Sequence, residues 1–248
     1  MSIDDGQAID IEENYFGTGC FLFLGDNSSI KNNTFEDLEY IMAGNILEYE
    51  NNKVINKNSK RGYKYISATE FPYTEFNYEN FCYFYSSGEL VFNNCIFEPC
   101  SQTYSLPQGN FTFGANYTLD FVSGYININN STVNLGLSNK ANLTINNCTA
   151  PNMKSISNSY NGVLSINDST VTLSDSIVNY GKITVDECKT FNTDEITNNT
   201  PGLITINDSS VTANYINNNS ASTEYEFNNV SCSFIKITSI RTDNGSIC

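Results

Sequence analysis

The fold is decided by three similar phrases in the second half of the chain: NGVLSINDSTVTL (161–173), YGKITVDECKTF (180–191) and PGLITINDSSVTA (201–213). Each phrase has a Gly near its start, alternates apolar and polar residues, and turns on Asn, Asp or Glu. The equivalent apolar anchors Ile166, Val185 and Ile206 lie 19 and 21 residues apart. A self-similar period of about 20 residues is typical of stacked-repeat proteins.

The same anchor recurs along most of the chain. Its other occurrences are Ile11, Ile30, Tyr49, Ile66, Phe92, Phe113, Ile128, Ile145 and Phe227. Period-2 alternation bounded by Gly and Asn or Asp indicates short, half-buried strands rather than helices, and 34–47 is the one helix candidate. The pattern predicts an all-β, single-stranded right-handed parallel β-helix of about twelve coils of roughly 19–21 residues. The leading alternative, a leucine-rich repeat, requires a Leu-dominated pattern that this chain lacks.

We expect residues 1–248 to form one β-helix domain, interrupted by an irregular, aromatic-rich insert at about 67–90. Four tyrosines in that insert are candidate platforms for sugar rings, because Tyr combines a rigid face with a hydroxyl group. They are Tyr73, Tyr78, Tyr83 and Tyr85. The alternative is that the insert is a buried cap or a lateral hydrophobic cluster.

Three residues after each anchor lies a column of small polar residues. It reads Asn14, Asn33, Asn52, Cys95, Asn116, Ser131, Cys148, Ser169, Cys188 and Ser209. Such side chains, stacked at a corner, can form hydrogen bonds along the solenoid axis. Adjacent coils never both carry Cys in this column, so disulfides within it are geometrically disfavoured. Cys95–Cys100 and Cys232–Cys248 stay open as alternatives.

One position earlier, the turn carries Asp168, Glu187 and Asp208 in consecutive coils. Stacking would bring these carboxylates within roughly 5–6 Å of one another. That spacing suits a calcium site or the carboxyl pair of a retaining glycosidase. Asn fills the same column in other coils, which favours a solvated acidic turn. The three residues are therefore metal-ligand candidates for calcium, and we expect no other cofactor.

Composition excludes several classes of function. Lys and Arg number 12 against 27 Asp and Glu, and the net charge of −15 repels nucleic acid and anionic membrane surfaces. The chain contains no His, the commonest general base and metal ligand. No stretch has the ~18–20 apolar residues of a membrane-spanning helix, so direct membrane insertion is not expected. The N-terminus lacks the layout of a secretory signal, so the chain is expected to be cytoplasmic, a mature form or a piece of a longer precursor. The repeat register is already running by Ile11, which favours a piece of a longer precursor.

Asn-x-Ser/Thr sequons are numerous, and glycosylation is allowed if the chain is secreted. They begin at Asn27, Asn32, Asn110, Asn116, Asn129, Asn130, Asn142, Asn147, Asn167, Asn198, Asn207, Asn218, Asn229 and Asn244. The turn motif itself creates several of them.

A catalytic role has weak support. The NTDE sequence (192–195) is faintly similar to the NTD motif of polygalacturonases, but the paired Asp, the His and the basic motif of that family have no counterparts. Lys182 and Lys189 flank the acidic column without a partner that would fix either as a base. We assign no catalytic residue.

The phrases LTINNCTA, VLSINDSTVT and LITINDSSVTANYINNNSA resemble archaeal adhesin-like surface proteins and polymorphic outer-membrane-type proteins, which share a pectin-lyase-like right-handed β-helix. The resemblance is best across 123–233. It implies an extracellular or cell-surface protein, adhesive or structural, that contacts glycans or proteins on a host or a neighbouring cell. The alternatives are a polysaccharide-processing lyase or hydrolase and a filament subunit that self-associates through its β-helix ends.

Overall fold

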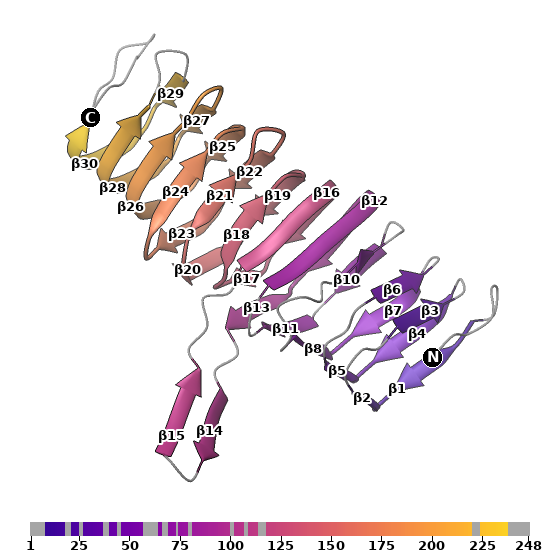
Figure 1. Ribbon diagram of the computed structural model, residues 1–248. Helices are drawn as coiled ribbons and strands as arrows, with labels where there is room; N and C mark the ends of the chain where they lie inside the picture. The colour runs from indigo at the N-terminus through magenta and orange to yellow at the C-terminus, as the bar shows by residue number, and fades with distance from the viewer. Residues whose placement is uncertain are drawn as a thin grey trace.

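The computed structural model describes residues 8–17, 21–24, 27–36, 40–43, 46–56, 64–65, 69–72, 74–78, 81–99, 102–106, 109–113, 118–219 and 224–237. Within these ranges the chain is all-β, and its strands wind into an elongated parallel β-solenoid (Figure 1). The segment 34–47, the one helix candidate, contributes strands instead. In the same ranges no helix is both long enough and apolar enough to cross a bilayer.

Each coil supplies strands to three parallel stacks. The first stack contains β1 (Asp10–Glu12), β4 (Ser28–Lys31), β7 (Ile46–Glu50), β10 (Thr69–Pro72), the second halves of β12 (Phe81–Asn93) and β16 (Thr118–Asn129), β19 (Asn142–Asn146), β22 (Val163–Asn167), β25 (Lys182–Asp186), β27 (Leu203–Asn207) and β29 (Glu224–Asn228).

The second stack follows the first after a tight corner. It contains β2 (Tyr15–Phe16), β5 (Thr34–Glu36), β8 (Asn52–Asn56), β11 (Thr74–Tyr78), β13 (Ile96–Pro99), β17 (Thr132–Val133), β20 (Thr149–Met153), β23 (Thr170–Leu173) and the first halves of β26 (Thr190–Asn198), β28 (Ser210–Asn218) and β30 (Ser231–Ile237).

The third stack returns the chain to the first. It contains β3 (Phe21–Leu24), β6 (Tyr40–Ala43), β9 (Lys64–Tyr65), the first halves of β12 and β16, β18 (Gly136–Asn139), β21 (Ile156–Asn158), β24 (Ser176–Asn179) and the second halves of β26, β28 and β30.

The anchors of the sequence repeat are in register in the first stack. Ile145 lies opposite Ile166, Ile166 opposite Val185, and Val185 opposite Ile206, all in parallel pairs. Because side chains alternate along a strand, this register places all four of these anchors on the inner face, where they are buried. The predicted parallel β-helix is therefore confirmed, and the sequence repeat sets the register in which its coils stack.

The count of about twelve coils is wrong, and the expected anchor Phe113 does not lie in the first stack. Phe113 belongs to β15 (Gly109–Phe113), which pairs antiparallel with β14 (Gln102–Leu106) in a hairpin that projects from the solenoid (Figure 1). Ile66 lies outside the described residues, and the register position opposite Phe92 is held by Phe71 of β10. The phrase around Phe113 matches the repeat motif in composition, but its strand pairs with the preceding strand β14 rather than with a neighbouring coil.

The segment expected to be an insert, 67–90, contains β10, β11 and most of β12. Strand β11 pairs in parallel with both β8 and β13, so the coils continue through this part of the chain. The element that leaves the solenoid is instead the hairpin at 102–113.

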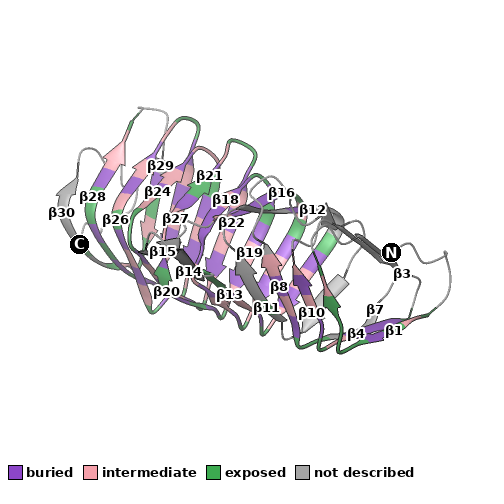
Figure 2. Cartoon of the chain, turned by 60° about the horizontal axis from the view of Figure 1, so that its bottom comes forward, coloured by how far each residue is buried: buried purple, intermediate pink, exposed green. Residues whose placement is uncertain are grey.

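The core is a continuous column of inward side chains, visible as alternating buried and exposed bands along the strands in Figure 2. Around β12 it is aromatic: the ring centroids of Phe84 and Phe121 lie 5.1 Å apart, and those of Phe92 and Phe97 5.4 Å apart. From β19 onward Ile, Leu and Val replace most of the rings. Each fully buried side chain contributes about 1.5–3 kcal/mol, and the outer surface is left to polar residues and loops.

Candidate functional site

The corner between the first and second stacks has the same backbone geometry in coil after coil. In each corner that the structure describes, one residue has a φ between 45° and 57°, in the left-handed region. These residues are Glu13, Asn32, Asn51, Asn94, Asn130, Asn147, Asp168, Glu187, Asp208 and Asn229. Asn and Asp tolerate this conformation better than most side chains, which explains why they dominate the column.

Next to this turn residue, a small polar side chain points inward and bonds to the neighbouring coil. The N–H of Cys148 donates to Ser169 Oγ at 3.0 Å, and the N–H of Cys188 donates to Ser209 Oγ at 2.9 Å. In the first coils an Asn side chain accepts the equivalent hydrogen bond, because the N–H of Asn33 donates to Asn52 Oδ1 at 3.1 Å. The expected axial ladder is confirmed within the described residues, which exclude Asn116.

The thiols in this ladder are structural groups. Cys148 and Cys188 are buried and form no disulfide. Burial raises the pKa of both thiols above the ordinary value, which keeps them protonated and poorly nucleophilic at neutral pH. The alternative bridges Cys95–Cys100 and Cys232–Cys248 each involve a residue outside the described ranges.

The structure places Asp168, Glu187 and Asp208 at the turn position of consecutive coils, with exposed side chains. Asp208 Oδ1 accepts a hydrogen bond from Asn229 Nδ2 at 2.5 Å, as Asn130 Oδ1 does from Asn147 Nδ2 at 2.7 Å. In the described ranges no group of three or more Cys, Asp or Glu side chains is arranged to hold a metal ion. Calcium at this column stays a prediction, and the geometry gives it no added support.

The last part of this corner is hollowed into a groove of about 480 Å³. Its lining comes from three successive coils: Glu187, Cys188, Lys189, Asp208, Ser209, Ser210, Asn229, Val230 and Ser231. The groove thus offers two carboxylates, one ammonium group, an amide and hydroxyl groups on the outer side. Asp168 belongs to the same column but lies outside the groove.

Lys189 is an extra residue in the corner that forms this groove. Val171 lies five positions after Ile166, and Val211 five positions after Ile206, but Phe191 lies six positions after Val185. The register nevertheless resumes on both sides, because Val171 lies opposite Phe191 and Phe191 opposite Val211. The additional residue is therefore absorbed as a bulge, and bulges commonly re-aim a side chain at a functional site. Sequence reasoning noted Lys189 but missed the local insertion, although the anchor spacing records it.

The tyrosines proposed as sugar platforms cannot be placed as a site. Tyr73 lies outside the described residues. Tyr78 belongs to β11, and Tyr83 and Tyr85 belong to β12, where the backbone is described but these side chains are not. Sugar binding by these tyrosines stays a prediction.

Sequence reasoning missed a second, fully buried ladder at the corner between the third and first stacks. Asn139 Nδ2 donates to Asn158 Oδ1 at 2.9 Å, Asn158 Nδ2 to Asn179 Oδ1 at 2.8 Å, and Asn179 Nδ2 to Asn198 Oδ1 at 2.8 Å. The same Nδ2 groups donate to backbone carbonyls of the loops, such as that of Gly181, and of the strand that follows, such as that of Leu203. The ladder therefore ties four coils together along the axis.

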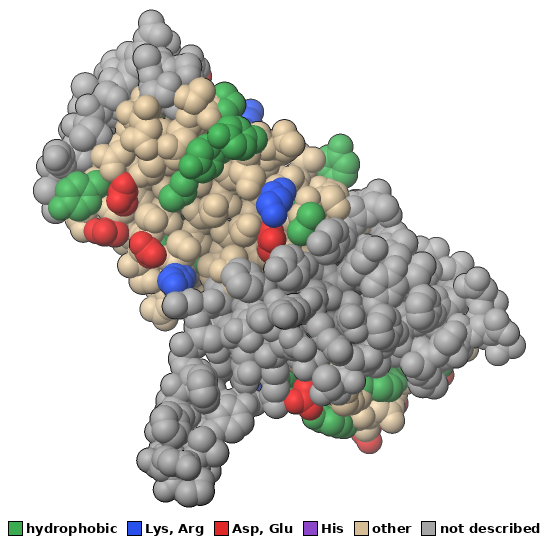
Figure 3. Space-filling model, viewed as in Figure 1, with side chains coloured by type: hydrophobic (Ala, Val, Ile, Leu, Met, Phe, Trp, Pro, Cys, Tyr) green, Lys and Arg blue, Asp and Glu red, His purple; other side chains and the backbone are tan. Residues whose placement is uncertain are grey.

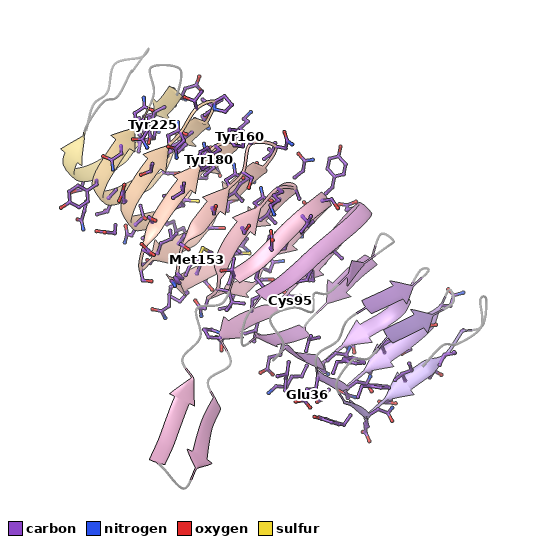
Figure 4. All side chains as sticks on the ribbon, viewed as in Figure 1. Glu36, Cys95, Met153, Tyr160, Tyr180 and Tyr225 are labelled. Carbon is purple, nitrogen blue, oxygen red and sulfur yellow. The ribbon has the colours of Figure 1, made fainter. Side chains whose placement is uncertain are left out.

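The loops at this second corner carry a pair of aromatic rings that the repeat motif does not reveal. Tyr160 and Tyr180 lie side by side at one edge of the solenoid, with ring centroids 5.0 Å apart and planes tilted by 41° (Figure 4). Tyr160 is 64% exposed. The face in Figure 3 carries a short hydrophobic stripe across a mainly polar surface of the C-terminal half. The signal available in the sequence was a Tyr shortly before the loop glycines Gly162 and Gly181.

Comparison of the chain with protein-family models, curated proteins and solved structures finds no match.

Proposed function

We propose that the protein is a non-catalytic extracellular scaffold that binds glycans through the corner groove at Glu187, Lys189, Asp208, Asn229 and Ser231. The observation that carries this proposal is the groove itself, because it breaks an otherwise repetitive corner and gathers complementary polar groups. Carboxylates and amides are suited to accept and donate hydrogen bonds to sugar hydroxyls.

The rigidity of the corner supports binding without catalysis. The groove floor includes Cys188 and Ser209, and the N–H of Cys188 donates to Ser209 Oγ across adjacent coils. A preformed site of this kind loses little conformational entropy when a ligand binds. Lys189 adds a positive group to a strongly acidic chain, so sugars with a carboxylate substituent are the favoured ligands.

The wider role that we propose is adhesion or structural display at a cell surface. The solenoid is a long scaffold whose outer turns are stacked Asn and Asp side chains. The resemblance of the repeat phrases to adhesin-like surface proteins supports the same role. Glycans or proteins on a host or neighbouring cell would be its partners.

Titration of the full chain with uronic-acid-containing oligosaccharides tests the proposal. Asp208→Asn should weaken binding by about tenfold, the loss typical of one charge-assisted hydrogen bond. Asn already occupies this turn position at Asn229, so the fold should tolerate the change. Asp168→Asn is the matched control, because Asp168 has the same φ > 0 position outside the groove. Equal effects of the two substitutions, or no binding by the parent chain, would refute the groove as a glycan site.

A polysaccharide-processing enzyme is the second candidate, because Glu187 and Asp208 occupy the same position in adjacent coils of the groove. Adjacent coils lie about 4.8 Å apart, near the carboxyl separation of about 5–5.5 Å in retaining glycosidases. New reducing ends from a bound polysaccharide, lost in Asp208→Asn and retained in Asp168→Asn, would favour this function over the scaffold.

Light scattering across a concentration series tests the filament alternative, which requires the particle mass to grow with protein concentration.

A further inference from the structure

The described sequons differ in whether their Asn side chain is available in the folded chain. Asn198 is fully buried, and its Nδ2 donates to the carbonyl of Gly202 at 2.8 Å. Asn147 is exposed, but its Nδ2 is held by Asn130 Oδ1 at 2.7 Å. Asn229 is held by Asp208 in the same way. A glycan on any of these nitrogens would replace one of its two amide hydrogens beside a hydrogen bond that joins two coils or fixes a loop, and would crowd that contact.

Asn142 is different. It opens β19 with an exposed side chain that makes no hydrogen bond to any residue in the described ranges. The sequon is Asn-Leu-Thr, with Leu143 in the core and Thr144 on the same outer face as Asn142, as the period-2 alternation of a strand requires. A substituent on Asn142 Nδ2 would therefore project into solvent without disturbing the coil.

The neighbouring coil supplies an aromatic surface for such a substituent. Tyr125 of β16 is the register partner of Asn142, so the two residues lie on adjacent strands about 4.8 Å apart. The Tyr125 side chain is 64% exposed, among the most exposed large hydrophobic residues in the described chain. The apolar face of a sugar ring packs favourably on such a phenol ring, in the same manner as other amphipathic contacts of Tyr.

We propose that Asn142 is an N-glycosylation site whose first sugar packs on Tyr125. In the transfer, Asn142 Nδ2 forms a bond to the anomeric carbon of a glycan donated by a lipid-linked sugar diphosphate. The bond from that carbon to the diphosphate oxygen breaks, the lipid diphosphate leaves with the electron pair, and one amide proton passes to a base. No redox change occurs. The inference rests on the proposed extracellular function, since that route brings the chain to such donors.

Site occupancy in secreted protein tests the proposal. The full chain is expressed behind an added secretion signal in a host that performs N-glycosylation, and glycopeptides from the soluble product are quantified by mass spectrometry after deglycosylation in ¹⁸O-labelled water. We expect occupancy at Asn142 at least about tenfold higher than at Asn147. These two sites form a matched pair, since both are exposed Thr sequons of the same coil. An empty Asn142, or equal occupancy at the two sites, would overturn the assignment.

A second measurement isolates Tyr125. Enzymatic removal of the glycan should lower the melting temperature by about 2–4 °C, the shift expected from losing one modest contact in a chain of this length. Tyr125→Ala should abolish that difference while leaving Asn142 occupied, and Tyr125→Phe should preserve it. A difference that survives in Tyr125→Ala would refute the stacking. Oligosaccharide binding at the groove is measured separately on Asn142→Gln, so failure of the proposed function and failure of this site give different results.

Discussion

The two corners of the solenoid both turn the chain and link neighbouring coils, but they do so with different side chains. At the corner between the first and second stacks, a left-handed residue and a small polar neighbour repeat at a fixed place after most of the described anchors, as at Asp168 and Ser169. At the corner between the third and first stacks, buried Asn side chains stack on one another, and the loops that follow vary in length. The first corner is partly solvated, whereas the second is closed off from water.

The difference shows which corner holds the coils together more strongly. Asn130 and Asn147 at the first corner bond through exposed side chains, where water can replace a lost partner. Asn158 and Asn179 at the second corner are 0% exposed, and each binds several groups in two neighbouring coils. An unsatisfied buried polar group costs about 1–3 kcal/mol. The corner between the third and first stacks should therefore contribute more to the free energy of unfolding.

Among substitutions that truncate a side chain, Asn158→Ala should cause the largest loss. The amide of Asn158 donates to Asn179 Oδ1, to the carbonyl of Gly162 at 3.1 Å and to that of Lys182 at 3.1 Å, and it accepts from Asn139. Removing it leaves several buried groups without a partner, so the free energy of unfolding should fall by about 4 kcal/mol. Urea denaturation measures this change. A loss below about 1 kcal/mol would mean that water or relaxation satisfies the ladder.

Gly181→Ala tests how tightly the same corner is closed. An added Cβ would lie 2.3 Å from the carbonyl oxygen of Gly162 and 2.4 Å from that of Ser159, both on the backbone. Overpacking of this kind costs about 1–3 kcal/mol. Gly17→Ala is the control, because an added Cβ there meets nothing within 4 Å. Thermal unfolding of the two variants should differ clearly, and equal melting temperatures would contradict the close packing.

Cys188→Ser and Cys188→Ala separate hydrogen bonding from packing at the first corner. The ladder already accepts Ser at Ser169 and Ser209, so Cys188→Ser should change the free energy of unfolding by less than about 1 kcal/mol. Cys188→Ala removes both the side-chain bond to the carbonyl of Ile166 and buried volume, and should cost about 1–2 kcal/mol. Chemical denaturation orders the variants, and a larger loss for Ser than for Ala would refute the ladder.

Glu187→Asn should give the smallest effect, with the opposite sign. Glu187 has a φ of 51°, a conformation that Asn adopts more readily than Glu. The substitution should raise the free energy of unfolding by about 0.5–1 kcal/mol. Glu187→Val, which places a β-branched residue at φ > 0, should lower it instead. Calorimetry measures the change in stability of both variants. Stabilisation by Glu187→Val would contradict the left-handed turn geometry.

The two corners also differ in how well the sequence alone could predict them. The first corner lies a fixed distance after an apolar anchor, so the small polar column, including Cys188, could be read from spacing. The buried Asn residues lie alternately six and eight residues before the next anchor, as Asn179 before Val185 and Asn198 before Ile206. Counted from the preceding anchor, however, Asn158, Asn179 and Asn198 all lie 13 residues after Ile145, Ile166 and Val185. The spacing therefore carried a signal for the ladder, and it was missed because only the short motif around each anchor was compared.

The candidate site shows the same limit. Asp168, Glu187 and Asp208 were assigned to one column correctly, yet only the last two line the groove. Which part of a repeated column becomes hollow depends on the local bulge at Lys189 and on the packing of three coils. The hairpin was missed because the phrase around Phe113 matches the repeat motif. The sequence LPQG (106–109), where β14 ends and β15 begins, nevertheless has the Pro and Gly typical of a turn.

The most direct test of the contrast between corners is the same chemical change at both, Asn179→Asp and Asn147→Asp, measured in one urea series at neutral pH. Asn179→Asp removes donors and places a carboxylate among the carbonyl oxygens of Gly181 and Leu203, whereas the exposed column of Asn147 already accommodates Asp208. We predict a loss of about 4 kcal/mol or more for Asn179→Asp and less than about 0.5 kcal/mol for Asn147→Asp. Equal losses at the two positions would contradict the claim that the buried Asn ladder holds the coils together.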